Sequence, residues 1–210
     1  MRACSATCNF IWFFFVWWYI YGSLSPMTIS KVPARVGDVA SRLRHESSRK
    51  IFAYWQGLNQ GHLPGYQLWD PIEVPKLMPW CTIIERGGET GFQLRFAGTA
   101  ICDFYGEEMT GQAIGRRMDA PARAYYFDCL EEVLNRPCAC FMTMQARSNT
   151  GRDCLFESLS LPLADADGKS FRIVNHQVIL EEVTYGETTT RFALPDIAEW
   201  IDVGAGVPDD

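Results

Sequence analysis

The sequence predicts an α+β fold with a five-stranded antiparallel sheet, helices on one face of that sheet and a helix flanking it at the N-terminal side. Three observations support this fold class. Segments with the period-two alternation of half-buried strands form two groups, a pair followed later by a set of three. Short Gly-containing turns join the strands within each group, which favours antiparallel hairpins. The segment between the groups has helical character, and its apolar side would cover one face of the sheet.

The first 26 residues are left out of this fold prediction. Phe10–Tyr21 is uncharged and apolar, and as a helix it would span about 18 Å, short of the roughly 30 Å of bilayer hydrocarbon. We interpret residues 1–26 as upstream sequence, with Met27 as the true start. A signal peptide or membrane anchor is an alternative, because Arg2 precedes the apolar run. A partner-binding segment is a third interpretation.

The flanking helix is predicted at Val36–Gln60, within an N-terminal segment that covers residues 27–65. Its apolar residues recur at helical spacing, and the polar stretch His45–Lys50 interrupts them. Tyr54 and Trp55 place a large aromatic surface on a segment outside the sheet. We expect these two residues to bind a partner protein or a second copy of the chain. Packing of the helix onto its own sheet is the alternative.

The central domain is predicted at residues 66–183, and it begins with a short helix and a hairpin. Pro71–Met78 has a Pro at the first helical position, so we expect one or two helical turns there. Trp80–Glu85 and Phe92–Phe96 alternate in the manner of strands. Gly87-Gly88 lies between them and predicts the turn of a β-hairpin.

Helical turns are then predicted at Thr99–Met118, and a longer amphipathic helix at Pro121–Asn135. Three strands complete the domain, at Cys138–Ala146, Cys154–Leu163 and Phe171–Val183. The alternation of the second of these slips near Glu157, which suggests a β-bulge. Residues 184–210 are predicted to be a loop-like tail with a short helix at Pro195–Ile201.

Charge and cysteine content narrow the class of protein. The chain has 210 residues and a formal net charge of −6, and an acidic protein repels a phosphate backbone, so no nucleic-acid binding is expected. The pair Arg116-Arg117 is interpreted as solvated loop charge. Buried thiols behave as small hydrophobic groups, and we expect reduced thiols and a cytoplasmic location. The cysteines in apolar segments are Cys81, Cys102, Cys129, Cys138, Cys140 and Cys154.

Several pieces of the N-terminal segment and the central domain together carry a resemblance to a known family. They are Tyr54-Trp55, Asp70-Pro71, Leu94-Arg95-Phe96-Ala97-Gly98-Thr99, Thr110-Gly111 and Gly151-Arg152-Asp153. In this combination they resemble the bacterial single-module PAS domains known as PAS_5, over roughly residues 50–183. Met109 stands where this family usually has Leu, which is a mild departure.

The resemblance implies a five-stranded sheet that cups a small cavity beneath helices. It also implies a sensory or protein-interaction role in bacterial signal transduction, without naming a ligand. No kinase or cyclase domain fits after residue 183, so we expect the output to pass through a signalling partner or through dimerisation. No membrane contact is expected unless residues 10–21 are a real anchor.

The predicted cavity has a soft wall on the third strand, where Cys138, Cys140, Met142 and Met144 share one face. Asn175, His176 or Gln177 would supply the few polar groups that orient a ligand. The apolar residues expected around a small ligand are Phe92, Leu94, Phe96, Phe104, Tyr105, Tyr126, Met142 and Met144. A solid core without a ligand is the alternative.

No cofactor, metal or catalytic residue is predicted. Gly151–Phe156 resembles the reactive-cysteine motif of flavin photoreceptors, but Cys154 follows the long helix instead of preceding it. That helix contains no His for haem, and we interpret His176 as a hydrogen-bonded core or pocket residue. Cys138 and Cys140 would need Cys129 and Cys154 to complete a zinc site.

An enzyme would need a nucleophile and a base. Cys154 and His176 lie on neighbouring predicted strands, but no third group orients them. We therefore predict a non-catalytic sensory or protein-interaction module. The alternative is a sensor or enzyme that holds flavin, haem or a metal in the same cavity.

Overall fold

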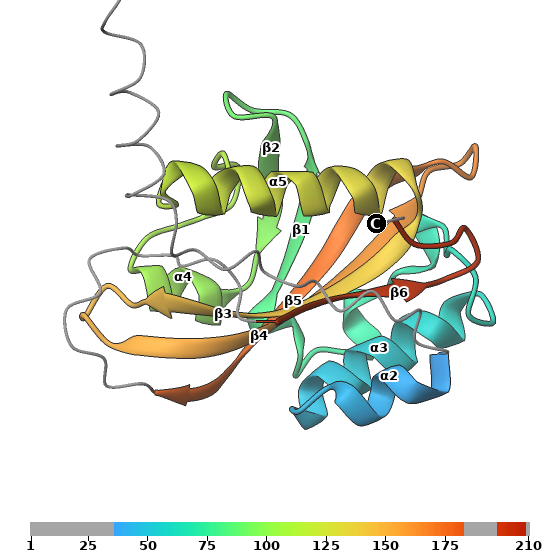
Figure 1. Ribbon diagram of the computed structural model, residues 1–210, viewed down its shortest axis with the longest axis horizontal. Helices are drawn as coiled ribbons and strands as arrows, with labels where there is room; N and C mark the ends of the chain where they lie inside the picture. The colour runs from blue at the N-terminus through green and yellow to red at the C-terminus, as the bar shows by residue number, and fades with distance from the viewer. Residues whose placement is uncertain (1–35, 183–196, 209–210) are drawn as a thin grey trace, which may run out of the picture.

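The structure is a computed structural model that describes residues 36–182 and 197–208 (Figure 1). Within these ranges one antiparallel sheet of six strands has the order β2-β1-β5-β4-β3-β6. The strands are β1 (Cys81–Arg86), β2 (Phe92–Ala97), β3 (Cys138–Arg147), β4 (Asp153–Ala164), β5 (Ser170–Glu182) and β6 (Ile197–Asp202). The α-helices are α2 (Val36–Arg42), α3 (Glu46–Leu58), α4 (Thr99–Tyr105) and α5 (Ala120–Asn135).

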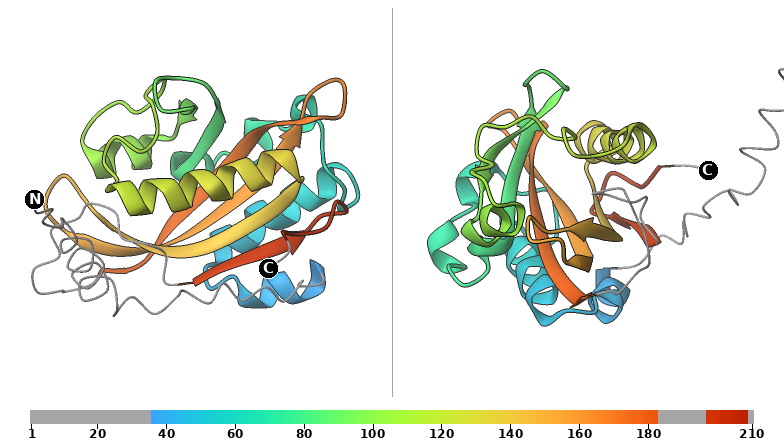
Figure 2. Two further views of the ribbon diagram at one scale, coloured as in Figure 1. Left: turned by 45° about the horizontal axis from the view of Figure 1, so that its top comes forward. Right: turned by 90° about the vertical axis from the view of Figure 1, so that its left-hand side faces the viewer.

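Helices cover both faces of the sheet. Helices α4 and α5 lie on one face, and α2 and α3 lie on the other (Figures 1 and 2). Each side has its own hydrophobic cluster, because alternate residues of every strand point to opposite faces. The prediction of an α+β fold with an antiparallel sheet is confirmed. The expectation of helices on a single face is too narrow, since the flanking segment covers the second face.

The five predicted strands all form, and a sixth strand joins them. The short helix predicted at Pro195–Ile201 is wrong, because β6 pairs with β3 along the edge of the sheet. Trp200 packs into the cluster on the α5 face, whereas Ile201 packs into the cluster on the α3 face. This period-two alternation belongs to a strand. The predictions for residues 1–35 and 183–196 lie outside the described residues.

The flanking segment forms two helices instead of the single helix expected at Val36–Gln60. The break falls before the polar stretch His45–Lys50, because a buried carboxylate from β4 binds the turn. Glu157 accepts hydrogen bonds from the backbone N–H groups of Arg44 at 2.6 Å and His45 at 3.2 Å. His45 then caps α3, since its Nδ1 accepts from the N–H of Ser47 at 3.1 Å.

Two further local predictions concern the segment before β1 and the middle of β4. The single short helix expected at Pro71–Met78 is replaced by separate 3-10 turns, η2 (Pro71–Glu73) and η3 (Met78–Trp80), after η1 (Tyr66–Leu68). The bulge expected near Glu157 is confirmed, because the pairing of β4 with β5 shifts register between Leu155 and Phe156. No helix within the described ranges is long and apolar enough to cross a bilayer.

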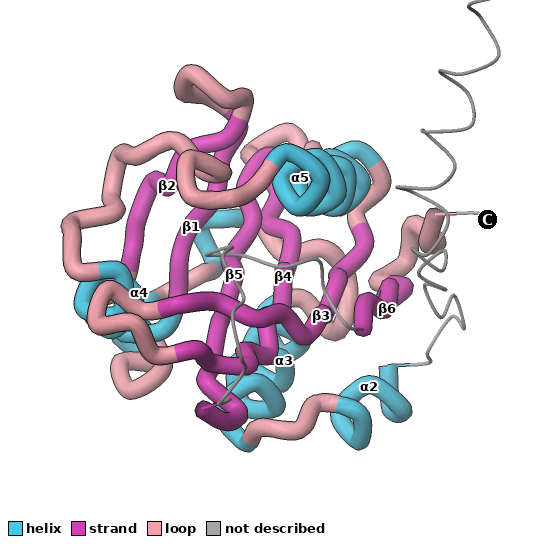
Figure 3. Tube along the Cα trace, turned by 60° about the vertical axis from the view of Figure 1, so that its left-hand side comes forward, coloured by secondary structure: helices cyan, strands magenta, loops and turns pink. Residues whose placement is uncertain are grey.

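The tube view in Figure 3 shows how this arrangement positions a site. Helix α5 lies over the strands β5, β4 and β3, and the chain between α4 and α5 runs beside the edge strand β2. We call this segment, residues 107–118, the 107–118 loop. It is the part of the α5 face where backbone other than a helix approaches the sheet.

Candidate ligand-binding cavity

A cavity of about 220 Å³ lies between the 107–118 loop, the helices α4 and α5, and the strands β1, β2 and β5. The loop provides more of its wall than any other segment. The lining residues are Thr82, Ile84, Leu94, Ile101, Tyr105, Glu107, Met109, Gln112, Ala113, Ile114, Gly115, Arg116, Arg117, Met118, Tyr126 and Gln177. The cavity therefore sits where the resemblance places one, beneath helices on the inner face of the sheet.

Backbone hydrogen bonds hold the 107–118 loop against β2. Leu94 N–H donates to the carbonyl of Gln112 at 2.9 Å, and Gly111 N–H donates to the carbonyl of Leu94 at 2.6 Å. Ile114 N–H donates to the carbonyl of Phe92 at 2.9 Å. Because β2 is the edge strand of the sheet, these bonds satisfy backbone groups that would otherwise face water.

Gly106 directs the chain from α4 into the loop. It caps α4 in the left-handed region, at φ 71°, where residues with a side chain are strained. A Cβ at this position would also lie 2.2 Å from the side-chain nitrogen of Asn149. Glycine is therefore required at this turn both for its backbone angle and for the close approach of the neighbouring loop.

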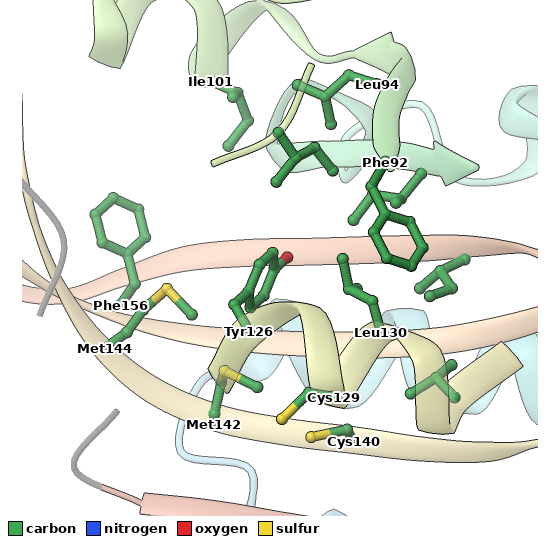
Figure 4. Close-up of a cluster of buried hydrophobic side chains, with 14 of the residues drawn as sticks. Phe92, Leu94, Ile101, Tyr126, Cys129, Leu130, Cys140, Met142, Met144 and Phe156 are labelled. Carbon is green, nitrogen blue, oxygen red and sulfur yellow. The ribbon is translucent and has the colours of Figure 1, made fainter. Parts of the chain in front are cut away.

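The interior of the cavity is apolar. Ile84, Leu94, Ile101 and Ile114 are all buried, and they come from β1, β2, α4 and the 107–118 loop respectively. In Figure 4, Tyr126 projects from α5 toward the side of the cluster on which Leu94 and Ile101 lie. Such walls favour an apolar body, since burying it removes hydrocarbon surface from water.

A chain of hydrogen bonds on the sheet orients one polar group toward the cavity. Ser158 and Ser160 on β4 accept from Asn175 Nδ2 at 2.9 and 3.0 Å. Asn175 Oδ1 accepts in turn from Gln177 Nε2 at 3.0 Å. No described residue donates to Gln177 Oε1, so this oxygen is an acceptor available to a ligand.

The two cavity tyrosines are neutral phenols. Burial raises the pKa of Tyr126 and of Tyr105 well above the ordinary value. The hydroxyl of Tyr126, in a side chain only 6% exposed, has no hydrogen-bond partner among the described residues. This hydroxyl is not one of the fully buried atoms that lack a partner, and Tyr126 lines the cavity, so a ligand atom or a water in the cavity can bond to it.

Charged groups gather at the mouth of the cavity. The guanidinium of Arg117 pairs with the Glu107 carboxylate, donates to the carbonyl of Tyr105 at 3.4 Å and lies 5.3 Å from the centre of the Tyr105 ring. Arg116 is exposed and donates to Gln112 Oε1 at 3.1 Å. The mouth therefore carries two cations and one carboxylate.

Four of the residues predicted to bind a ligand line the cavity. They are Leu94, Tyr105, Tyr126 and Gln177. Four others pack in the hydrophobic cluster around it without lining it, namely Phe92, Phe104, Met142 and Met144. Asn175 lies behind Gln177 as its hydrogen-bond partner. Phe96 is half-buried and belongs to neither hydrophobic cluster.

His176 is not a cavity residue, and its place follows from the strand alternation. Asn175 and Gln177 face the α5 side, so the residue between them faces α3. Its Nδ1 lies 3.5 Å from Ser48 Oγ, and burial together with the charge of His45 lowers the pKa of His176 to about 4. The prediction that His176 could orient a ligand in the cavity is therefore wrong; of the two places considered for it, core or pocket, the structure shows the core.

The two aromatic residues expected to anchor a partner are used within the chain. Trp55 is fully buried against the sheet, and its Nε1 donates to the carbonyl of Pro162 at 2.8 Å. The hydroxyl of Tyr54 hydrogen-bonds the backbone of Asp70, and its ring meets the edge of Trp69. Trp55 has no exposed surface for a partner, so the alternative of packing on the chain's own sheet describes this helix.

Candidate reactive groups are separated or protonated. Cys154 belongs to the cluster on the α5 face, whereas His176 points to the α3 face, so the two do not form a nucleophile–base pair. Burial raises the pKa of Cys154, and raises the pKa of Cys138 and Cys81 to about 12. Within the described ranges, no group of three His, Cys, Asp or Glu residues is placed to hold a metal.

A model of the PAS domain family known as PAS_5 matches residues 43–176, from the break between α2 and α3 to β5. The chain belongs to this family. It is a PAS domain, and the family recognised from its sequence pieces is confirmed. No curated protein sequence matches the chain.

Solved structures with a similar fold include light-sensing and kinase-associated domains. The light state of the Aureochrome1 LOV photoreceptor is 12% identical, with 52% of this chain and 87% of that chain covered and a TM-score of 0.39. A LOV protein of Rhodobacter sphaeroides is 9% identical, with 53% and 69% covered and a TM-score of 0.40. A sensory box histidine kinase/response regulator of Burkholderia thailandensis is 15% identical, with 53% and 85% covered and a TM-score of 0.36.

The residues that the sequence did not identify are mainly those of the 107–118 loop. The loop has no alternation, and Arg116-Arg117 was interpreted as solvated charge. The signal that would have helped is its glycines, since Gly111 and Gly115 both adopt positive φ and direct the chain along β2. Thr82 and Ile101 were also missed, because neither stands out in a strand or helix pattern.

Proposed function

We propose that this PAS domain is a non-catalytic sensor that binds a small, mainly apolar molecule in the cavity and signals through a partner protein or through dimerisation. The cavity of about 220 Å³ is the observation that carries the proposal. An apolar cavity of about 150 Å³ holds one benzene ring, so this one suits a ring with a short chain or an aliphatic body of similar size. Its few oriented polar groups match the usual composition of small-molecule sites.

Larger cofactors do not fit the cavity as it stands. Sites for drug-sized ligands begin at about 300 Å³, above the 220 Å³ found here. The lining residues include no cysteine for a flavin adduct and no histidine for a haem iron. A flavin or a haem would require the 107–118 loop to move away from β2 and break the backbone bonds that join them.

The absence of an assembled reactive group supports the non-catalytic part of the proposal. In the described residues, Cys154 and His176 lie on opposite faces of the sheet, and the buried thiols are protonated near neutral pH. A non-catalytic domain signals by changing its contacts with a partner protein or with a second copy of the chain. Ligand binding would do so by shifting the 107–118 loop and α4, which together form most of the cavity wall.

A thermal-unfolding screen with small apolar and amphipathic molecules tests the proposal. We expect a subset of them to raise the unfolding temperature, because a ligand that binds only the native state stabilises it. The variant Leu94→Trp would fill part of the cavity and should lose these shifts, whereas Arg95→Gln, on the opposite side of β2, should keep them. Shifts that persist in Leu94→Trp, or their absence in the parent protein, would contradict the proposal.

A further inference from the structure

The charge at the mouth of the cavity differs in sign from the charge of the chain. The chain has a formal net charge of −6, but the ionic groups that line the cavity are Arg116, Arg117 and Glu107. The mouth thus has one more positive than negative charge. A local positive charge beside an apolar interior, on an otherwise acidic protein, selects for an anion at that point.

Arg117 already pairs with a carboxylate of the chain, and it would pair with the carboxylate of a ligand in the same way. Its guanidinium lies over the ring of Tyr105 and donates to the carbonyl of the same residue, so the position of its plane is fixed. The Glu107 carboxylate pairs with this guanidinium, and only 20% of the Arg117 side chain is exposed. A guanidinium has five N–H donors in a rigid fork, and it binds carboxylates more strongly when water is partly excluded.

Arg116 provides the charge that is not balanced. Its contact is the neutral side-chain oxygen of Gln112, at 3.1 Å, and no described carboxylate pairs with it. Gln112 is itself held by the 107–118 loop against β2, through the carbonyl that accepts from Leu94. Arg116 is thus a cation without a paired carboxylate among the described residues, and beside it Arg117 is a cation that is paired with Glu107.

We infer that the ligand is a small carboxylic acid in its anionic form. This inference rests on the proposed function. The apolar body of the acid lies among Ile84, Leu94 and Ile101, and its carboxylate lies at the mouth between Arg116 and Arg117. Glu107 competes with the ligand for Arg117, so binding exchanges an internal carboxylate for that of the ligand. The exchange alters the link between the two ends of the 107–118 loop.

Matched acid and amide probes test the inference on the full chain. Phenylacetate, 3-phenylpropionate and hexanoate have the apolar bodies that the volume admits, and their primary amides have nearly the same shape but no charge. Calorimetric titration should show the best acid binding about tenfold or more tightly than its amide, because a charge-assisted bond adds about 1.5–3 kcal/mol. The preference should shrink as salt concentration rises.

Variants of the mouth locate the effect. Arg116→Gln breaks no ion pair among the described residues and should reduce the preference for the acid without changing the affinity of the amide. Glu107→Gln removes the competing carboxylate and should strengthen acid binding several-fold, again without changing the amide. Arg95→Gln removes an exposed arginine that does not line the cavity, and it is the control that should behave as the parent protein.

Each result has a distinct meaning. Amides that bind as tightly as the acids would overturn the inference and leave the proposed function standing. An acid preference that survives in the double variant Arg116→Gln/Arg117→Gln would also overturn it, because groups other than these two arginines would then bind the carboxylate of the ligand. If no acid or amide binds, the inference and the proposed function both fail. The inference holds if the preference is present, falls in Arg116→Gln and rises in Glu107→Gln.

Discussion

The α3 face and the α5 face of the sheet differ in how completely side chains fill the space beneath their helices. On the α3 face, Trp55 and Phe52 lie fully buried against Leu159 and Leu161. Trp55 and Glu157 on that face are hydrogen-bonded within the chain, whereas the buried Nε1 of Trp69 has no partner among the described residues. On the α5 face, a cavity of about 220 Å³ remains, and polar groups such as Gln177 Oε1 face it.

The two helical layers therefore have different tasks. The α3 layer closes the sheet and stabilises it through dense packing, which is sensitive to small changes in volume. The α5 layer, with α4 and the 107–118 loop, leaves room that another molecule can occupy.

Removing the largest side chain of the α3 layer should have the largest effect. Trp55→Ala is expected to lower the free energy of unfolding by about 3–5 kcal/mol, because it leaves a cavity in a packed core and removes the bond to Pro162. Denaturant unfolding measures this change. Tyr54→Phe, which removes one half-exposed hydroxyl, is the matched control and should cost about 1 kcal/mol. A cost near 1 kcal/mol for Trp55→Ala would show that the α3 layer is not the solid one.

Acid should weaken the α3 layer through His176. Burial holds its pKa at about 4 in the folded chain, against about 6.5 when unfolded, so between these values the unfolded chain binds more protons. Stability is therefore complete above pH 6.5 and falls as the pH is lowered toward 4, by up to about 3 kcal/mol. Unfolding curves across this range measure the loss.

The variant His176→Gln isolates that contribution. The groups facing His176 are Ser48 and His45, and His45 adds positive charge that opposes protonation. With glutamine at position 176, the fall in stability between pH 6.5 and 4 should be much smaller than in the parent chain. An unchanged pH dependence would assign the loss to other groups and contradict the buried, neutral state of this histidine.

Replacing a leucine with tryptophan should lower the free energy of unfolding by different amounts on the two faces of the sheet. Leu161→Trp overpacks the α3 face, where Leu161 is fully buried, and is expected to cost about 1–3 kcal/mol or more. Leu94→Trp places the new ring toward the cavity and is expected to cost less than about 1 kcal/mol. Paired denaturation curves give the difference. Equal costs for the two variants would mean that the α5 face is as full as the α3 face.

Most of the fold could be predicted from the sequence because alternation and turn chemistry are local. Cys138, Cys140, Met142 and Met144 share one face of β3 as their spacing requires, and Asp70 caps the turn that it precedes. The strand β6 was not predicted, because its pairing with β3 depends on a free sheet edge far away in the sequence. The break between α2 and α3 was misplaced for a similar reason, since Glu157 on β4 determines it.

The site was predicted only in part, because a cavity is a property of several segments at once. Strand spacing identified Leu94 and helix spacing identified Tyr126, whereas Gln177 was expected only as one of three consecutive polar residues on the last strand. His176 was grouped with its neighbours although a strand cannot point three consecutive residues to one side. The role of Arg116 and Arg117 follows from the path of the 107–118 loop along β2, which no local pattern in the sequence encodes.

Native mass spectrometry of the full chain, with an absorption scan, tests the central contrast most directly. We expect the purified parent protein, or the protein after incubation with 3-phenylpropionate, to carry one bound small molecule that Leu94→Trp does not carry. The same spectra report whether the protein is a monomer or a dimer. A parent protein that stays empty under both conditions, with a mass pattern identical to that of Leu94→Trp, would contradict the account of a solid α3 face opposed to a ligand-accepting α5 face.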